Sequence, residues 1–187
     1  MKNPINAVII FGSARSQGNT LHAVQKVQQQ LGFELPLINL ADINVGEFDY
    51  EFSQQDDFPA LIQQLLEYDL IILSTPVYWY SVSAKMKCFI NRLSDLLIID
   101  KPSGRCLKDK KLAVISSYST HPEGIDGFEP PLKNTANYFG MFYLGAYFHY
   151  CGEDAEGIKA SEISLKKFIT HLQALIAVPT TTSYSSP

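Results

Sequence analysis

Three continuous runs of apolar residues constrain the fold of this chain most strongly. Residues 7–11 read AVIIF, residues 70–75 read LIILST, and residues 112–118 read LAVISSY. Because these runs do not alternate apolar with polar residues, each predicts a β-strand that is buried on both faces. Strands of this kind belong to parallel sheets whose two faces are covered by helices.

Helical patterns separate the runs, as a parallel sheet requires. Apolar residues at three- and four-residue spacing predict a helix over 21–31 that ends at Gly32. The other expected elements are helices over 57–68, 83–98, 132–141 and 165–177, weaker strands over 33–40 and 144–150, and connections over 44–55 and 100–111. Right-handed crossovers then favour a doubly wound α/β fold. We expect one domain over 1–178 and a flexible polar tail over 179–187.

Composition argues against several classes of partner. The chain has 187 residues, of which 46% are hydrophobic, and a formal net charge of −4. Scattered Lys and Arg together with a negative net charge do not favour nucleic acid or an anionic membrane as a partner. The three cysteines, Cys88, Cys106 and Cys151, are far apart and predict no metal site. A reducing, cytoplasmic location fits this sparse cysteine content.

The loop that follows the first buried strand reads GSARSQGNT over residues 12–20. It opens a helix, so free backbone amides and the positive end of the helix dipole converge there. Its hydroxyl, amide and guanidinium groups suit phosphate oxygens, and neither GxGxxG nor GxxxxGK[ST] is present. The loop therefore predicts a site for a terminal monophosphate, with an ordinary strand-to-helix turn as the alternative. The residues expected to bind are Ser13, Arg15, Gly18, Asn19 and Thr20.

The loop that follows the second buried strand places three aromatic residues in succession. Residues 76–81 read PVYWYS, and such a run cannot turn wholly into the core at a strand end. A flat conjugated ligand would provide the missing apolar partner, while backbone amides contact its polar edge. Packing against a neighbouring subunit or capping of the core is the alternative. The residues concerned are Pro76, Val77, Tyr78, Trp79, Tyr80 and Ser81.

The loop that follows the third run carries several hydroxyl groups and one histidine. We expect Ser117, Tyr118 and Ser119 to close over the other side of the same ligand, and a surface loop without this role is the alternative. In a doubly wound sheet the ligand lies beyond the carboxyl ends of the strands, where all three loops meet. Tyr78, Tyr118 and His121 are candidate proton donors there.

Two of these loops resemble one known family. GSARSQGNT resembles the G-S-x-R-x-x-G-N-T phosphate loop of the NAD(P)H-dependent FMN reductases, which are flavodoxin-like proteins, and TPVYWYSVSAKMKCFINRLSDL resembles their second flavin loop with the helix after it. The resemblance implies a flavodoxin-like five-stranded parallel sheet in the order 2-1-3-4-5, with helices on both faces. It implies that the five binding residues of the first loop hold the FMN phosphate. It also implies that Pro76, Val77, Tyr78 and Trp79 flank the isoalloxazine, with Tyr80 and Ser81 near its rim. The compact cysteine cluster of the iron–sulfur branch is missing.

The resemblance also implies an activity. We expect NAD(P)H to pass hydride to bound FMN and a small acceptor (a quinone, azo or nitro compound, or free flavin) to take the electrons in a ping-pong cycle. The helix over 83–98 is expected at a homodimer interface, or within a higher homo-oligomer. A flavodoxin-type one-electron carrier and a non-catalytic flavin-binding or regulatory protein are the alternatives.

Overall fold

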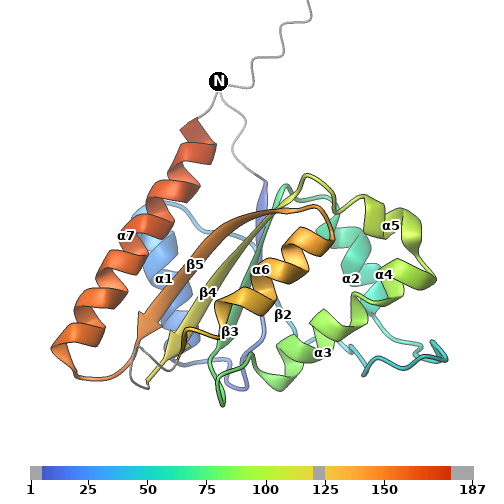
Figure 1. Cartoon of the computed structure of the whole chain (residues 1–187), viewed down its shortest axis with the longest axis horizontal. Helices are drawn as coiled ribbons and strands as arrows, with labels where there is room; N and C mark the ends of the chain where they lie inside the picture. The colour runs from blue at the N-terminus through green and yellow to red at the C-terminus, as the bar shows by residue number, and fades with distance from the viewer. Residues whose placement is uncertain (1–5, 120–124, 178–187) are drawn as a thin grey trace, which may run out of the picture.

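A computed structural model describes residues 6–119 and 125–177 and shows a five-stranded parallel sheet between two layers of helices (Figure 1). The strand order is β2-β1-β3-β4-β5, as predicted. The strands are β1 (Ala7–Phe11), β2 (Leu37–Asn39), β3 (Leu70–Pro76), β4 (Lys111–Tyr118) and β5 (Phe142–Tyr150). The predicted doubly wound α/β fold is thereby confirmed.

The helices divide between the two faces of the sheet (Figure 1). One face is covered by α1 (Asn19–Leu31) and α7 (Ala155–Ala177), which also contact each other. The opposite face is covered by α2 (Phe58–Leu65), α3 (Ala84–Arg92), α4 (Asp95–Ile98), α5 (Lys101–Arg105) and α6 (Glu129–Tyr138). The predicted tail, 179–187, lies outside the described residues.

Alternate residues of the central strands enter two separate cores. Ile9 and Ile72 pack among the apolar residues of α1 and α7, whereas Ile10 and Leu73 pack among those of α2, α3 and α6. Every residue of β1 and β3 is buried. This double burial explains why the strands read as unbroken apolar runs. No helix in the described part of the chain is long and apolar enough to span a membrane.

Parallel register brings the loops after β1, β3 and β4 to one edge of the sheet. Phe11 pairs with Ser74, and Pro76 pairs with Ser117. At the same edge, Ser117 pairs with His149 of β5. Residues that are more than a hundred positions apart in sequence therefore meet beyond the carboxyl ends of the strands.

The expected continuous helix over 83–98 is wrong: the structure has two helices, α3 and α4. The amides of Leu93 and Ser94 donate to carbonyls three residues back, Ile90 at 3.2 Å and Asn91 at 3.1 Å, so the helix tightens and breaks there. At this break Arg92, only 3% exposed, donates through Nε to Asp95 at 3.0 Å and pairs with Asp56. A buried ion pair with a partner 36 residues away is invisible to helical periodicity.

Arg92 also fastens the long connection before α2 to the body of the protein. Its guanidinium lies 4.7 Å from the centre of the Phe58 ring, and it donates to the Gly46 carbonyl at 3.4 Å. Burial acts to raise the pKa of Asp56, but hydrogen bonds from Arg92 and from the backbone lower it overall. The connection over 41–57 is therefore held in place although it contains no regular secondary structure.

Other element boundaries differ for local reasons. The region 100–111 was expected to lack regular structure but contains α5, whose start is capped by the Asp100 carboxylate, 3.3 Å from the Ser103 amide. Helix α7 begins ten residues earlier than expected, because Asp154 accepts a hydrogen bond from the Gly157 amide at 2.8 Å. Strand β2 is short, and Pro36 directly precedes it.

A buried histidine lies under the carboxyl end of the sheet. His149 is 6% exposed, shares a 3.0 Å hydrogen bond with the Tyr147 hydroxyl, and has its ring centre 5.3 Å from that of His22. Burial, with smaller contributions from the charges of Lys26 and His22, lowers the pKa of His149 to about 4. The fold therefore holds this imidazole neutral at neutral pH.

We predict that His149 makes the fold sensitive to acid. Its folded pKa lies below the unfolded value of about 6.5, so the unfolded state binds the proton first. The free energy of unfolding should fall as pH drops from about 6.5 toward about 4, by at most about 1.4 kcal/mol per pH unit from this group. Urea denaturation at several pH values measures the slope.

His149→Gln should flatten that slope because it keeps a polar group for Tyr147 and cannot titrate. His171→Gln is the matched control, since His171 is exposed on α7, where its ring shares a hydrogen bond with the Leu144 carbonyl, and it should leave the slope nearly unchanged. Equal slopes in the wild type and in His149→Gln would contradict the assignment.

Candidate functional site

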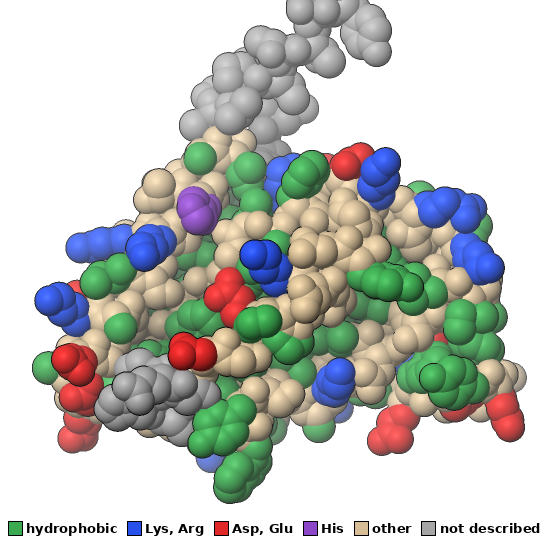
Figure 2. Space-filling model, viewed as in Figure 1, with side chains coloured by type: hydrophobic (Ala, Val, Ile, Leu, Met, Phe, Trp, Pro, Cys, Tyr) green, Lys and Arg blue, Asp and Glu red, His purple; other side chains and the backbone are tan. Residues whose placement is uncertain are grey.

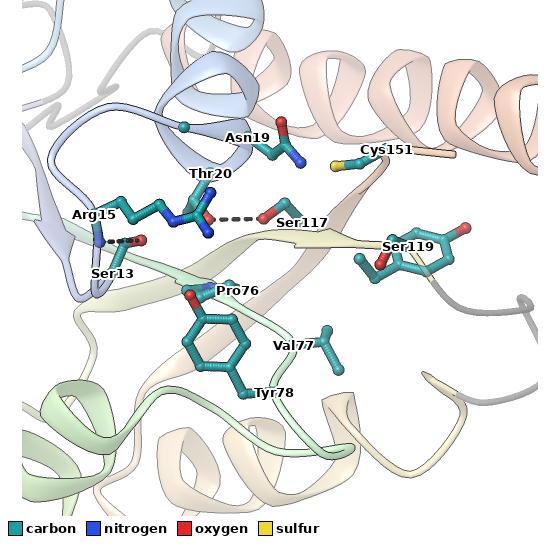
Figure 3. Close-up of a pocket in the computed structure, with 12 residues that line it drawn as sticks. Ser13, Arg15, Asn19, Thr20, Pro76, Val77, Tyr78, Ser117, Ser119 and Cys151 are labelled. Atoms are coloured by element: carbon teal, nitrogen blue, oxygen red, sulfur yellow. Dashed lines mark hydrogen bonds between the residues drawn. The ribbon is translucent and has the colours of Figure 1, made fainter. Parts of the chain in front are cut away.

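A cavity of about 300 Å³ opens at the carboxyl ends of the strands, where the three predicted loops meet (Figure 3). The five predicted residues of the first loop line it, as do Ser117, Tyr118 and Ser119 of the third loop and the first half of the second loop. The lining residues are Ser13, Arg15, Gly18, Asn19, Thr20, Pro76, Val77, Tyr78, Ser117, Tyr118, Ser119 and Cys151. The structure thus brings together residues from four segments of the chain.

The first loop forms an open donor set at one end of the cavity. Gly18 is the N-cap of α1 and no side chain caps this helix, so its first amides are not occupied by a capping group. Arg15 extends over the cavity toward Thr20 (Figure 3), and its backbone amide donates to Ser13 Oγ at 3.3 Å. Uncapped amides, a guanidinium and two buried hydroxyls are the donors that an anion needs.

Two hydroxyl contacts set the relative positions of the loops. Thr20 Oγ1 and Ser117 Oγ are 2.7 Å apart and buried, which joins the start of α1 to the end of β4. Ser83 caps α3, with its Oγ accepting from the Met86 amide at 3.2 Å, and donates to the Gly12 carbonyl. Ser83 was not among the predicted site residues, although a serine before an apolar helical run is an N-cap signal.

The second loop is a tight hairpin with a strained tip. Tyr78 and Ser81 exchange backbone hydrogen bonds of 2.8 and 3.0 Å, and Trp79 and Tyr80 have φ values of 49° and 63°. Two positive φ values in a two-residue turn are typical of type I′, which favours Asn and Gly. Trp79 is 93% exposed and Tyr80 61% exposed. These two residues and Ser81, all predicted to contact the ligand, do not line the cavity.

The third loop supplies a buried phenol. Tyr118 is 5% exposed, and its carbonyl accepts from the Cys151 amide at 2.8 Å. Burial raises the pKa of the Tyr118 hydroxyl, with smaller contributions from Tyr150 and Cys151, so the phenol keeps its proton at neutral pH. His121, the remaining candidate proton donor, lies outside the described residues.

Cys151 is a lining residue that sequence reasoning missed. It follows β5 and faces Asn19 across the cavity (Figure 3), and burial raises the pKa of its thiol. A single cysteine with no neighbouring ligand pattern carries no signal in the sequence. Within residues 6–119 and 125–177, no group of three or more His, Cys, Asp or Glu side chains is arranged to hold a metal ion.

The structure is a flavodoxin-like α/β fold whose carboxyl edge places an uncapped helix start beside an aromatic loop. Residues 5–156 match the model of the NADPH-dependent FMN reductase family. The chain belongs to that family, which confirms the predicted resemblance and FMN as the cofactor of the family.

Individual relatives match only part of the chain, at moderate sequence identity. The chain is 33% identical over 96 residues to YwqN of Bacillus subtilis strain 168, a protein whose name describes an NAD(P)H-dependent FMN-containing oxidoreductase. The alignment covers 48% of this chain and 52% of YwqN, so the chain matches only about half the length of this relative.

Solved structures share the fold. The Trp repressor binding protein from Bacillus subtilis superposes with a TM-score of 0.67 at 24% identity, covering 88% of this chain and 98% of that one. An FMN-dependent NADH-azoreductase from Bacillus anthracis, solved in complex with FMN, gives a TM-score of 0.62 at 12% identity and covers 92% of this chain and 100% of its own.

We predict that the hairpin tip can be stabilised by removing its strain. Replacing Trp79 with Asn and Tyr80 with Gly supplies residues that accept positive φ, and it should raise the free energy of unfolding by about 1–2 kcal/mol. Little packing is lost because both rings are mostly exposed. Urea denaturation measures the change.

Trp79→Ala with Tyr80→Ala is the matched control, because alanine removes the rings but keeps the strained backbone. That variant should gain no stability. A double Asn-Gly variant that is no more stable than the double alanine variant would argue against stored strain.

Proposed function

We propose that this chain is an FMN-dependent NAD(P)H oxidoreductase that reduces a small acceptor. The observation that carries the proposal is the meeting of an uncapped helix start, Arg15 and an aromatic loop in one cavity at the carboxyl edge of the sheet. The family to which the chain belongs supports it. FMN, when bound, supplies the redox chemistry by taking hydride from NAD(P)H and passing electrons to an acceptor.

The first loop would hold the FMN phosphate. The residues at the start of α1 line the cavity without a capping side chain, and the guanidinium of Arg15 adds a positive charge with a planar fork of donors. The hydrogen bond between Thr20 and Ser117 positions this cradle relative to β4 before any ligand enters. Such preorganisation lowers the cost of ordering the site on binding.

The second and third loops would hold the flat ring. Tyr78 and Tyr118 both line the cavity and provide apolar surface, while Val77 is fixed by its amide, which donates to the Ser117 carbonyl at 2.9 Å. Tyr118 keeps its proton and is therefore a hydrogen-bond donor rather than a base. The chain's own part is to bind, orient and partly exclude water, and it needs no side-chain acid.

We propose that nucleotide and acceptor use the same opening in turn. Trp79 and Tyr80 are exposed and do not line the cavity, which would leave its opening free for a planar partner. A quinone, an azo or nitro compound, or free flavin has the flat shape that fits, and release of the nucleotide before entry of the acceptor gives a ping-pong cycle.

We also propose that the chain acts as a homodimer. The face that contains α4 exposes apolar side chains, with Leu97 38%, Ile98 48% and Ile99 59% exposed. Exposed apolar residues that adjoin one another favour a protein partner. This face includes the carboxyl-terminal part of the segment 83–98 that was predicted to lie at the interface.

We predict that Arg15→Ala weakens FMN binding about 10- to 100-fold, because one charge-assisted hydrogen-bonding group contributes about 1.5–3 kcal/mol. Fluorescence titration of apoprotein with FMN measures the dissociation constant. Lys166→Ala is the matched control, since Lys166 is an exposed cation on α7 that lines neither this cavity nor the surface near α4. Equal affinities for the two variants would remove Arg15 from the phosphate site.

We predict two-electron behaviour in the wild-type protein. Double-reciprocal plots at several fixed acceptor concentrations should be parallel, as a ping-pong cycle requires. Anaerobic reductive titration should show little radical by electron paramagnetic resonance. A large, long-lived radical signal would favour the one-electron carrier, and protein that neither retains nor rebinds FMN would favour the non-catalytic alternative.

A further inference from the structure

An exposed aromatic segment projects from the connection between β2 and α2. We call residues 47–52, Glu-Phe-Asp-Tyr-Glu-Phe, the aromatic turn. The Phe48 ring centre lies 5.0 Å from that of Tyr50 and 6.0 Å from that of Phe52, in edge-to-face arrangements. Tyr50 is nevertheless 83% exposed. In Figure 2 hydrophobic side chains project at this end of the molecule with acidic side chains on both sides.

The aromatic turn is rigid although it is exposed. The Asp49 carboxylate accepts from the Ser53 amide at 3.2 Å, from Ser53 Oγ at 3.0 Å and from Gln54 Nε2 at 2.9 Å. At the base of the turn the Gly46 carbonyl accepts from Cys88 Sγ at 3.0 Å and from Arg92. A preorganised segment loses little conformational entropy when it docks.

Phe52 has a φ of 52°, which is uncommon for a bulky residue. The fold thus holds a strained residue in a segment where Tyr50 is exposed and the Phe48 and Phe52 rings are half-buried. Strain of this kind is found where a surface is used.

A second surface is apolar with a positively charged rim, and so complements the acidic aromatic turn. A cavity of about 500 Å³, which we call the basic groove, lies between α4, α5 and the end of α6. Leu96, Leu97, Tyr138 and Phe139 give it an apolar lining, and Lys101, Arg105 and Lys108 give it three positive charges.

These cations are free of salt bridges. Among the residues that the structure describes, the salt bridges all involve Arg92. Two acidic residues adjoin the groove in sequence. The Asp100 carboxylate accepts a hydrogen bond from the Ser103 amide and so caps α5, and Asp109 directly follows Lys108. Lys and Arg side chains gather over α5 in Figure 2. The groove therefore suits an apolar group that is flanked by negative charge.

We propose that the aromatic turn of one copy docks in the basic groove of a second copy, and the reverse. Aromatic rings would meet Leu97, Tyr138 and Phe139, while Glu47 and Glu51 would meet the cations of the rim. In Figure 2 the hydrophobic and acidic side chains at the end of the molecule that carries the turn, and the Lys and Arg side chains over α5, are seen on the same face. A two-fold axis could therefore form both contacts at once. This closes the assembly at two copies.

A second copy fits better than an unrelated partner, because this chain itself carries both halves of the contact. Its net charge of −4 disfavours close approach of another acidic protein except where opposite charges are matched locally. The inference deepens the proposed homodimer and does not depend on flavin chemistry.

Charge exchange tests the pairing. Glu51→Arg and Arg105→Glu each place like charges across the interface, and each should raise the dimer dissociation constant by about tenfold or more. The double variant restores opposite charges and should recover most of the affinity. Sedimentation velocity over a wide range of protein concentrations measures all three, and raised salt should weaken the wild-type dimer.

Glu34→Arg is the matched control, since Glu34 is exposed and lies beside neither surface, and it should leave the dimer unchanged. Circular dichroism melting verifies that each variant is folded, and FMN titration reports the cofactor site separately. A wild-type monomer at all concentrations would overturn the proposal. Single variants that dimerise like the wild type, or a double variant that does not recover, would overturn it as well.

Discussion

Burial of β1 and β3 on both faces is the constraint on which the rest of the structure depends. Because neither strand offers a solvated face, helices must cover both sides and the strands must run parallel. All carboxyl ends then open at one edge, and the polar loops there have no core of their own. Ser13, Thr20 and Ser117 satisfy one another or remain available for a ligand, so the cavity follows from the way the sheet is buried.

Local strain is concentrated where aromatic rings meet solvent. Trp79, Tyr80 and Phe52 all have positive φ, and a sequence chosen only for stability would place Gly or Asn at such positions. In both segments the hydrogen bonds lie at the base and the rings at the tip. The surrounding structure therefore fixes the backbone and leaves the rings available to a ligand or a partner.

The sheet and the meeting of the three loops at one cavity could be predicted because their signals are local in sequence. Unbroken apolar runs specify double burial, and double burial places the loops after the strands at one edge of a parallel sheet. The break between α3 and α4 could not be predicted, because it depends on Arg92 meeting Asp56 from a distant connection. Cys151 was missed for the same reason: only the folding of β5 beside α1 brings it to Asn19. The direction of the Trp79 ring depends on turn geometry rather than on residue type.

Three adjoining depressions on the helical layer formed by α3 to α6 connect the hairpin to the basic groove. One apolar depression, lined by Tyr80, Ile90 and Thr135, adjoins a second that shares Ile90 and Thr135 and reaches Leu97 and Tyr138, which also line the basic groove. A copy seated in the groove would lie along this line, with the exposed hairpin at its far end. Docking would then cover apolar surface next to the cavity mouth, so that association and access to the site are coupled through one continuous face. The aromatic rings that are exposed to solvent in a single copy would then lie against a protein partner.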